Sequence, residues 1–162
     1  MGVPGCRKGT VAARAAAALG WPFAEGDDAH PPANVAAMRS GRALTDDDRW
    51  PWLNDLAAWI AGHDAAGRSS VLACSALRRP DRDVLRSGAG RVLFVHLDVP
   101  PEVIMSRLAE RRGHFMPASL LASQLAAIEP LAPDENGLVL DLRHPPGELV
   151  EQLVAHVSQD KS

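Results

Sequence analysis

Residues 2–10 read GVPGCRKGT, and a run rich in alanine follows them as far as Leu19. Three glycines and one proline within these nine residues favour a tight turn, whereas the alanines that follow favour a helix. A turn that opens directly into a helix leaves backbone N–H groups free to bind an anion. Lys8 adds a positive charge at the same place.

This stretch agrees in part with the phosphate-binding pattern G-x-x-x-x-G-K-[ST]. In that pattern backbone N–H groups surround the phosphates, the lysine reaches the outer phosphates, and the hydroxyl holds Mg²⁺. Gly2 and Lys8 occupy their positions, but Arg7 replaces the second glycine and Gly9 replaces the hydroxyl residue. The adjacent Thr10 points about 100° away on a helix. Taken alone, the stretch also fits a glycine-rich turn that simply opens a helix.

Composition narrows the class of protein. The 162 residues are 46% hydrophobic and 23% charged with a net charge of −3, which predicts a single globular domain spanning residues 1–162. Scattered basic residues argue against nucleic-acid binding, and no apolar run approaches the ~20 residues of a membrane span. The two cysteines, Cys6 and Cys74, lack paired spacing, so we expect free thiols and a reducing cytoplasm.

Short apolar segments alternate with helical segments along the rest of the chain. We expect strands at residues 21–25, 70–75, 91–97 and 137–142, the last two buried on both faces. We expect helices at residues 9–19, 32–39, 46–66, 79–86, 101–112, 117–127 and 147–157. This order predicts an α/β fold, a three-layer parallel sheet with helices on both faces. Ligands of such sheets bind at the carboxyl ends of the strands.

Further blocks follow the loop in order, at residues 25–34 (EGDDAHPPAN), 44–53 (LTDDDRWPWL), 73–79 (ACSALRR) and 107–117 (RLAERRGHFMP). With the loop, they make the chain from Gly2 onward resemble the gluconokinases, P-loop kinases that phosphorylate D-gluconate on its 6-hydroxyl with ATP. The resemblance implies a P-loop kinase fold with a helical lid at about 107–127, ATP and Mg²⁺ as cofactors, and gluconate as substrate. It also implies a homodimer, with no nucleic-acid or membrane partner.

The resemblance and the chemistry of phosphoryl transfer together give the expected catalytic residues. The reaction needs positive charge around the moving group and a carboxylate near the accepting hydroxyl. We expect Lys8, Asp27 and Arg111 to be catalytic, with Asp27 orienting or deprotonating the hydroxyl. Nucleotide-binding residues are expected to be Gly2, Gly5, Lys8, Gly9, Thr10, Arg107 and Arg111. The residues expected near Mg²⁺ are Thr10 and Glu25.

Gluconate carries a carboxylate and several hydroxyls, so its pocket should contain arginines for the former and small polar groups for the latter. The expected substrate residues are Asp27, His30, Arg49, Ser75, Arg78, Arg82 and His114. The sequence does not decide whether Arg78 or Arg79 points inward. Each residue also has a structural interpretation: Asp27 as a cap, and the arginines as solvated side chains or partners of helix dipoles.

Two departures from the family pattern bear on activity. Arg7 would crowd the loop if its position needs a positive φ or a close approach to phosphate, and Gly9 removes the Mg²⁺ hydroxyl. These departures favour an alternative function, a gluconokinase-like paralogue that binds ligand without efficient phosphoryl transfer. A kinase of the shikimate type is a weaker alternative, because the HPPAN and TDDDRWPWL blocks argue against it.

The start of the chain is the larger departure. A phosphate loop normally follows a buried strand, but one residue, Met1, precedes Gly2. We therefore expect the middle strand to be absent and its two neighbours to lie about 10 Å apart with unpaired edges. A misplaced start codon is the favoured explanation, and a decayed paralogue comes next. A trimmed chain, or repair of the sheet by another segment, would also account for the short start.

Overall fold

The computed structural model describes residues 1–110 and 120–159. Their helices are α1 (Lys8–Leu19), α2 (Pro32–Arg39), α3 (Asp46–Ala65), α4 (Arg79–Arg86), α5 (Pro101–Glu110), α6 (Leu121–Ala126) and α7 (Pro146–Gln159), with a short 3-10 helix η1 (Gly26–Ala29). The strands are β1 (Phe23–Glu25), β2 (Val71–Ala73), β3 (Phe94–Asp98) and β4 (Gly137–Asp141). The expected alternation of strands and helices is confirmed.

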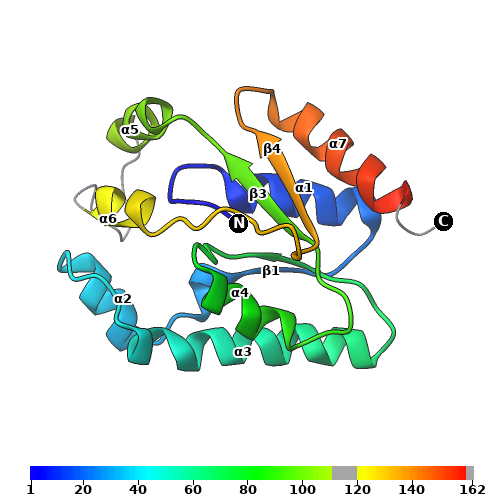
Figure 1. The fold of residues 1–162 in the computed structure, drawn as a ribbon, viewed down its shortest axis with the longest axis horizontal. Helices are drawn as coiled ribbons and strands as arrows, with labels where there is room; N and C mark the ends of the chain where they lie inside the picture. The colour runs from blue at the N-terminus through cyan, green and yellow to red at the C-terminus, as the bar shows by residue number, and fades with distance from the viewer. Residues whose placement is uncertain (111–119, 160–162) are drawn as a thin grey trace.

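Helices cover both faces of the strands. Figure 1 shows α7 on one side of the strands and α3 and α4 on the other, while α1 packs against α7, β1 and β2. Each side has its own apolar core. The α1 and α7 side buries Val11, Ala15, Leu149 and Leu153. The α3 and α4 side buries Trp52, Leu53, Leu56 and Leu85. The expected layered α/β fold is confirmed.

The beginning of α3 is set by a capping box. The Thr45 hydroxyl accepts a hydrogen bond from the Asp48 N–H at 3.2 Å, and the Asp48 carboxylate accepts one from the Thr45 N–H at 2.8 Å. These bonds, together with one from Arg42, lower the pKa of Asp48 to about 2. A helix start satisfied in this way is stable at a defined residue. It therefore fixes Asp46, the first residue of α3, which contacts two arginines described below.

The four strands form two separate parallel pairs. β1 pairs with β2, and β3 pairs with β4. Between the pairs, the Met1 amino group donates to the Val95 carbonyl, and the Met1 carbonyl accepts from the Leu97 N–H at 3.0 Å. On the other side, the Gly2 N–H donates to the Ser75 carbonyl at 3.2 Å. The expected gap between the neighbours of the middle strand is confirmed.

One expectation about β4 is wrong. Its apolar run predicted a strand buried on both faces, but Gly137 is exposed and Val139 is 56% exposed. In the described sheet β4 pairs with β3 alone, so it is an edge strand. An apolar run cannot distinguish a central strand from an edge strand.

The two cysteines are free, as expected, and both are buried. Burial raises the pKa of the Cys74 thiol to about 12, which keeps it protonated and unreactive at neutral pH. None of the helices in the described ranges combines the length and hydropathy needed to cross a membrane.

The buried Met1 amino group predicts a pH dependence of stability. Burial lowers its pKa from 8.0 to about 6, and nearby Lys8 acts in the same direction while Cys6 and Cys74 oppose it. Between pH 6 and 8 the unfolded chain therefore binds more protons than the folded chain. The free energy of unfolding should rise over this range by up to roughly 3 kcal/mol. Urea denaturation at pH 6.0 and 8.0 measures this change.

Two histidines titrate in the same direction and need a control. Burial lowers the pKa of both His30 and His96, and the Met1 amino group adds to the effect at His96. A chain acetylated on the Met1 amino group retains both histidines but cannot titrate at residue 1. We expect its stability to change less between pH 6.0 and 8.0. Identical profiles for the free and acetylated chains would contradict the prediction.

Candidate active site

The turn of residues 2–7 adopts the strained geometry that a phosphate loop requires. Gly2 has φ 144°, and a Cβ there would lie 2.8 Å from Cys6 Sγ. Arg7, which immediately precedes α1, has φ 60° and ψ 29°, in the left-handed region. A side chain in that region costs about 1–2 kcal/mol relative to the right-handed one. Residue 7 therefore needs a positive φ in this turn, and Arg7 adopts that conformation although it is not a glycine.

The first turn of α1 presents backbone N–H groups to this loop. Within the described residues no side chain caps the start of α1, and its first turn contains no acidic residue. Lys8 Nζ donates to the Val3 carbonyl at 3.3 Å, so the ammonium lies back over the loop. Free N–H groups at a helix start beside a lysine form a site suited to phosphate.

Glu25, the last residue of β1, places its carboxylate against Gly9. A Cβ built on Gly9 would collide with Glu25 Oε2, so this oxygen lies where a hydroxyl side chain at residue 9 would begin. Burial and then the charge of Asp27 raise the pKa of Glu25, while Lys8 opposes them. The fold thus brings Lys8, Glu25 and Asp27 within electrostatic range of one another. Thr10 is exposed.

Trp52 anchors the segment that follows β1. Its indole Nε1–H donates to the Gly26 carbonyl at 2.8 Å, and its ring stacks on His30 with centroids 4.0 Å apart. His30 Nδ1 is buried and has no partner among the described residues. Burial lowers the pKa of His30, which keeps the ring neutral. A neutral imidazole with an unpartnered nitrogen can hydrogen-bond a substrate hydroxyl. Sequence reasoning did not identify Trp52 as a site residue.

Arg49 and Arg78 converge on one carboxylate. Both donate through Nη2 to Asp46 Oδ1, Arg78 at 2.7 Å. Asp81 Oδ1 lies 3.2 Å from Arg78 Nη2 and 3.8 Å from Arg49 Nε. Asp46 is the more exposed of the two acids, with 54% of its side chain accessible against 8% for Asp81. The aspartates were not expected here, because the sequence presents them as residues at helix starts.

The contacts of the neighbouring arginines decide which of them joins the site. Arg79 donates to both oxygens of Asp134, at 3.0 and 2.9 Å, and to Asp83 at 2.9 Å. Its backbone N–H donates to the Glu129 carboxylate at 2.7 Å. Arg79 therefore faces the loop of residues 129–136, whereas Arg78 faces Arg49.

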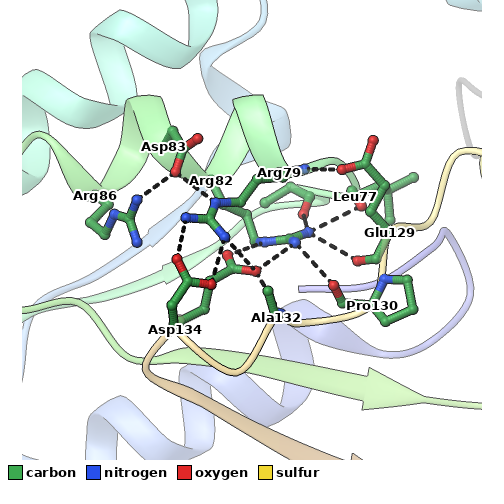
Figure 2. Close-up of polar contacts among 11 residues, drawn as sticks. Leu77, Arg79, Arg82, Asp83, Arg86, Glu129, Pro130, Ala132 and Asp134 are labelled. Atoms are coloured by element: carbon green, nitrogen blue, oxygen red, sulfur yellow. Dashed lines mark hydrogen bonds and ion pairs between the residues drawn. The ribbon is translucent and has the colours of Figure 1, made fainter.

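The structure corrects the expectation that Arg82 binds substrate. Its side chain is 1% exposed and pairs with the fully buried Glu135 carboxylate, Nε to Oε1 at 2.6 Å and Nη2 to Oε2 at 2.9 Å. Its remaining N–H groups donate to the carbonyls of Leu77, Glu129 and Pro130 at 3.2–3.3 Å (Figure 2). With these donors used inside the protein, Arg82 holds α4 to the 129–136 loop.

Of the remaining expected residues, one lies beside the loop: Ser75 follows β2, and its carbonyl accepts a hydrogen bond from the Gly2 N–H. Arg111 and His114 lie outside the described residues. Arg107 is described only as a backbone residue of α5. The described part of the site is thus built from the start of α1 and the segments that leave β1 and β2.

An α/β fold whose glycine-rich loop ends in a lysine at the start of a helix is typical of the P-loop nucleotide-binding proteins, a class that includes the P-loop kinases. A gluconokinase from Gluconobacter oxydans is 46% identical to this chain over 156 residues, covering 96% of this chain and 88% of that protein. The chain therefore belongs to the gluconokinase family. No family model matches it.

Solved structures agree with this membership. An unliganded sugar kinase from Janibacter sp. has a TM-score of 0.93 at 53% identity, over 98% of this chain and 91% of that chain. A gluconokinase from Sinorhizobium meliloti has a TM-score of 0.87 at 41% identity, over 98% and 89% respectively. A shikimate kinase from Aquifex aeolicus, with a TM-score of 0.56 at 15% identity, shares the fold alone.

Proposed function

We propose that this chain transfers the γ-phosphoryl group of ATP to the 6-hydroxyl of D-gluconate, with Mg²⁺. The observation that carries the proposal is the convergence of Arg49 and Arg78 on a single exposed carboxylate, that of Asp46. Arg78 lies on the segment that leaves β2, which the Gly2–Ser75 hydrogen bond ties to the phosphate loop, and Arg49 lies in the first turn of α3. A carboxylate site beside a phosphate site suits a sugar acid and a nucleotide.

Residues 2–10 are proposed to bind the nucleotide phosphates. Gly2, Gly5 and the N–H groups of Gly9 and Thr10 would surround them, and Lys8 would leave the Val3 carbonyl to bind the outer phosphates. Such donors act mainly by stabilising the charge on the moving phosphoryl group. The left-handed Arg7 supports this assignment, because the loop takes its required turn without the usual glycine. Arg107 and Arg111 remain proposed partners of the phosphates.

Glu25 fits the Mg²⁺ position. Mg²⁺ prefers oxygen ligands and is commonly held by one or two carboxylates plus substrate phosphates. The Glu25 carboxylate lies where the missing hydroxyl of residue 9 would begin, and Thr10 is a second candidate ligand. When bound, Mg²⁺ supplies neutralisation of phosphate charge. Glu25 would thus replace the oxygen that is lost at Gly9.

The substrate side is proposed to work through three groups. The gluconate carboxylate would replace Asp46 between Arg49 and Arg78. His30 and Ser75, together with His114, would bind hydroxyls. Asp27 would accept or orient the proton of the 6-hydroxyl.

The comparisons do not favour an impaired paralogue. The two buried, free thiols support a reducing cytoplasm as the location.

A coupled ADP-release assay with gluconate and Mg·ATP tests the proposal. We expect turnover with gluconate, and a fall in kcat of roughly 10²- to 10⁴-fold for Asp27→Asn, because the amide cannot accept the proton. Asp28→Asn, at the exposed neighbouring residue, is the matched control and should retain near-normal kcat. Absence of turnover with gluconate and with other sugar acids would overturn the proposed function.

Arg78 and Arg79 provide a second matched pair. A charged hydrogen bond is worth about 1.5–3 kcal/mol, so Arg78→Ala should raise the KM for gluconate by roughly 10- to 100-fold. Arg79→Ala should leave the KM nearly unchanged, because its side chain faces Asp134 and Asp83. Steady-state kinetics over a range of gluconate concentrations separates the two. Equal effects on KM would contradict the assignment of Arg78.

A further inference from the structure

Arg78, the proposed partner of the gluconate carboxylate, follows a strained turn. Two residues before it, Ala76 has φ 43°, in the left-handed region that residues other than glycine rarely adopt. Arg78 is the N-cap residue of α4, and its own side chain makes no capping hydrogen bond among the residues that the structure describes. A strained turn beside a helix start without a local cap does not hold one conformation by itself. Contacts from elsewhere in the chain must therefore fix the direction of the Arg78 side chain.

Glu129 supplies such contacts from the loop that follows α6. Its backbone N–H donates to the Leu77 carbonyl at 2.8 Å, and its Oε2 accepts from the Arg79 N–H at 2.7 Å (Figure 2). Leu77 and Arg79 are the two neighbours of Arg78 in the chain. One residue, 50 positions beyond Arg79, thus bonds the backbone on both sides of Arg78.

These two bonds fix both backbone dihedrals of Arg78. Peptide groups are planar, so the conformation of a residue is set by the rotation of its two flanking peptide planes, φ and ψ. The Leu77 carbonyl belongs to the plane before Arg78, and the Arg79 N–H belongs to the plane after it. Arg78 has φ −107° and ψ 152°, which keeps it extended immediately before the helix. Without the Glu129 carboxylate, the backbone of Arg78 would be held on one side only.

Glu129 is itself held in place by a buried pair. Its carbonyl accepts from Arg82 Nη1 at 3.2 Å, and Arg82 pairs with the buried Glu135 carboxylate. The backbone of Glu129 is therefore fixed to α4 even without its carboxylate, and the residue as a whole is exposed. Removal of the carboxylate should accordingly disturb the turn before α4 with little effect on the stability of the fold.

The guanidinium of Arg78 depends on this positioning. Its Nη2 donates to Asp46 at 2.7 Å and to Asp81 at 3.2 Å, whereas its Nε is buried and has no partner among the described residues. Nε and Nη2 form the edge of a guanidinium that binds a carboxylate through two parallel hydrogen bonds. Two parallel bonds require a closely defined geometry, so the point from which the side chain starts must be fixed.

We infer that Glu129 is a positioning residue for gluconate binding, which holds Arg78 in place through the backbone and does not itself touch the substrate. The inference rests on the proposed function, in which Arg78 binds the gluconate carboxylate. Glu129 should therefore act on gluconate affinity through Arg78 alone, and by position rather than by charge. It should act on KM and not on kcat, because the carboxylate of gluconate lies at the opposite end of the molecule from the 6-hydroxyl.

A double-mutant cycle with steady-state kinetics tests the inference. Glu129→Ala should raise the KM for gluconate roughly 10-fold, with kcat and the KM for ATP within about threefold of the original. In an Arg78→Ala background the same substitution should change the KM by less than about twofold, because the side chain that Glu129 positions is gone.

Two conservative variants separate position from charge. Glu129→Gln retains an acceptor oxygen at the same reach, so its KM for gluconate should stay within about threefold of the original. Glu129→Asp retains the charge but is one carbon shorter, so it should raise the KM as Glu129→Ala does. The aspartate variant also replaces the alanine variant in the cycle if the latter does not fold. A normal KM for Glu129→Asp with a raised KM for Glu129→Gln would overturn the inference.

Asp134→Ala is the matched control. Asp134 lies in the same loop and also bonds Arg79, but through the side chain of the arginine, at 3.0 and 2.9 Å. Its removal should leave the KM for gluconate nearly unchanged. Equal rises in KM for Asp134→Ala and Glu129→Ala would contradict the inference. So would a Glu129→Ala effect that persists in full in the Arg78→Ala background, since it would show a merely structural role.

Gluconate binding without ATP distinguishes this inference from the proposed function. Titration calorimetry with gluconate alone should show the same roughly 10-fold weakening for Glu129→Ala. That weakening in a chain without turnover would overturn the proposed function and support the role of Glu129. Turnover with equal affinities in the two chains would retain the function and overturn the role of Glu129. A chain that neither binds nor phosphorylates gluconate would overturn both.

Discussion

Replacing Arg82 by alanine is expected to lower the free energy of unfolding by about 3–5 kcal/mol, because it removes both hydrogen bonds from an arginine to a buried carboxylate. Glu135 is fully buried, and its oxygens accept two hydrogen bonds from Arg82 and one from the Ala132 N–H at 2.9 Å. The substitution also removes donors from the carbonyls of Leu77 and Glu129. Chemical denaturation of the two chains measures the difference.

Arg86→Ala is the matched control. Arg86 lies on the same helix, is 39% exposed and donates to Asp83, so its removal should change stability by less than about 1 kcal/mol. A small loss for Arg82→Ala together with a raised KM for gluconate would return Arg82 to the substrate site. The hydrogen bonds from Arg82 lower the pKa of the Glu135 carboxyl group. The stabilisation by the pair should therefore be present above the ordinary pKa of 4.5 and decline as the pH falls below it.

Replacing Lys8 by methionine is expected to reduce kcat by roughly 10²- to 10³-fold, the typical cost of one donor to a developing negative charge. Methionine preserves most of the length and the apolar stem of the side chain, so the fold should be retained. Lys8 Nζ bonds to a loop carbonyl at 3.3 Å, a contact with little effect on stability. The coupled assay measures kcat, and thermal unfolding verifies the fold.

The composition of the chain provides the control for Lys8. Lys161 is the other lysine, and it stands next to the last residue of the sequence. Lys161→Met removes the same charge from the whole molecule but should leave kcat nearly unchanged. A Lys8→Met chain with kcat within about threefold of the original would contradict the role proposed for the loop.

Local signals made most of the fold predictable. Thr45 ahead of three aspartates marked the start of α3, and the apolar runs marked the strands to within three residues at each boundary. The gap in the sheet followed from the position of Gly2 in the chain. The exposure of Val139 did not follow, because whether β4 has a second neighbour depends on the topology of the whole sheet.

The site was predictable as a set of residue types but not as a set of contacts. Arg82 looked like its neighbours Arg78 and Arg79, and its partner Glu135 lies 53 residues further along the chain. The choice between Arg78 and Arg79 depends on the direction each takes at the start of α4. Likewise, the sequence at Gly9 indicates only that a hydroxyl ligand is missing. That the Glu25 carboxylate lies against Gly9 depends on the tertiary structure.

The divided sheet also has a consequence for cooperativity. β1 and β2 with α3 and α4 lie on one side of the gap, and β3 and β4 with α7 lie on the other; backbone bonds from Met1 and Gly2 and the buried Arg82–Glu135 pair join the two sides. α1 packs against elements of both sides, and it begins at the loop proposed to hold phosphate. Parts of a fold on the two sides of such a gap can open with different free energies. Nucleotide bound at the start of α1 would stabilise the helix that contacts both sides. It would therefore couple their unfolding, so that the two sides unfold together.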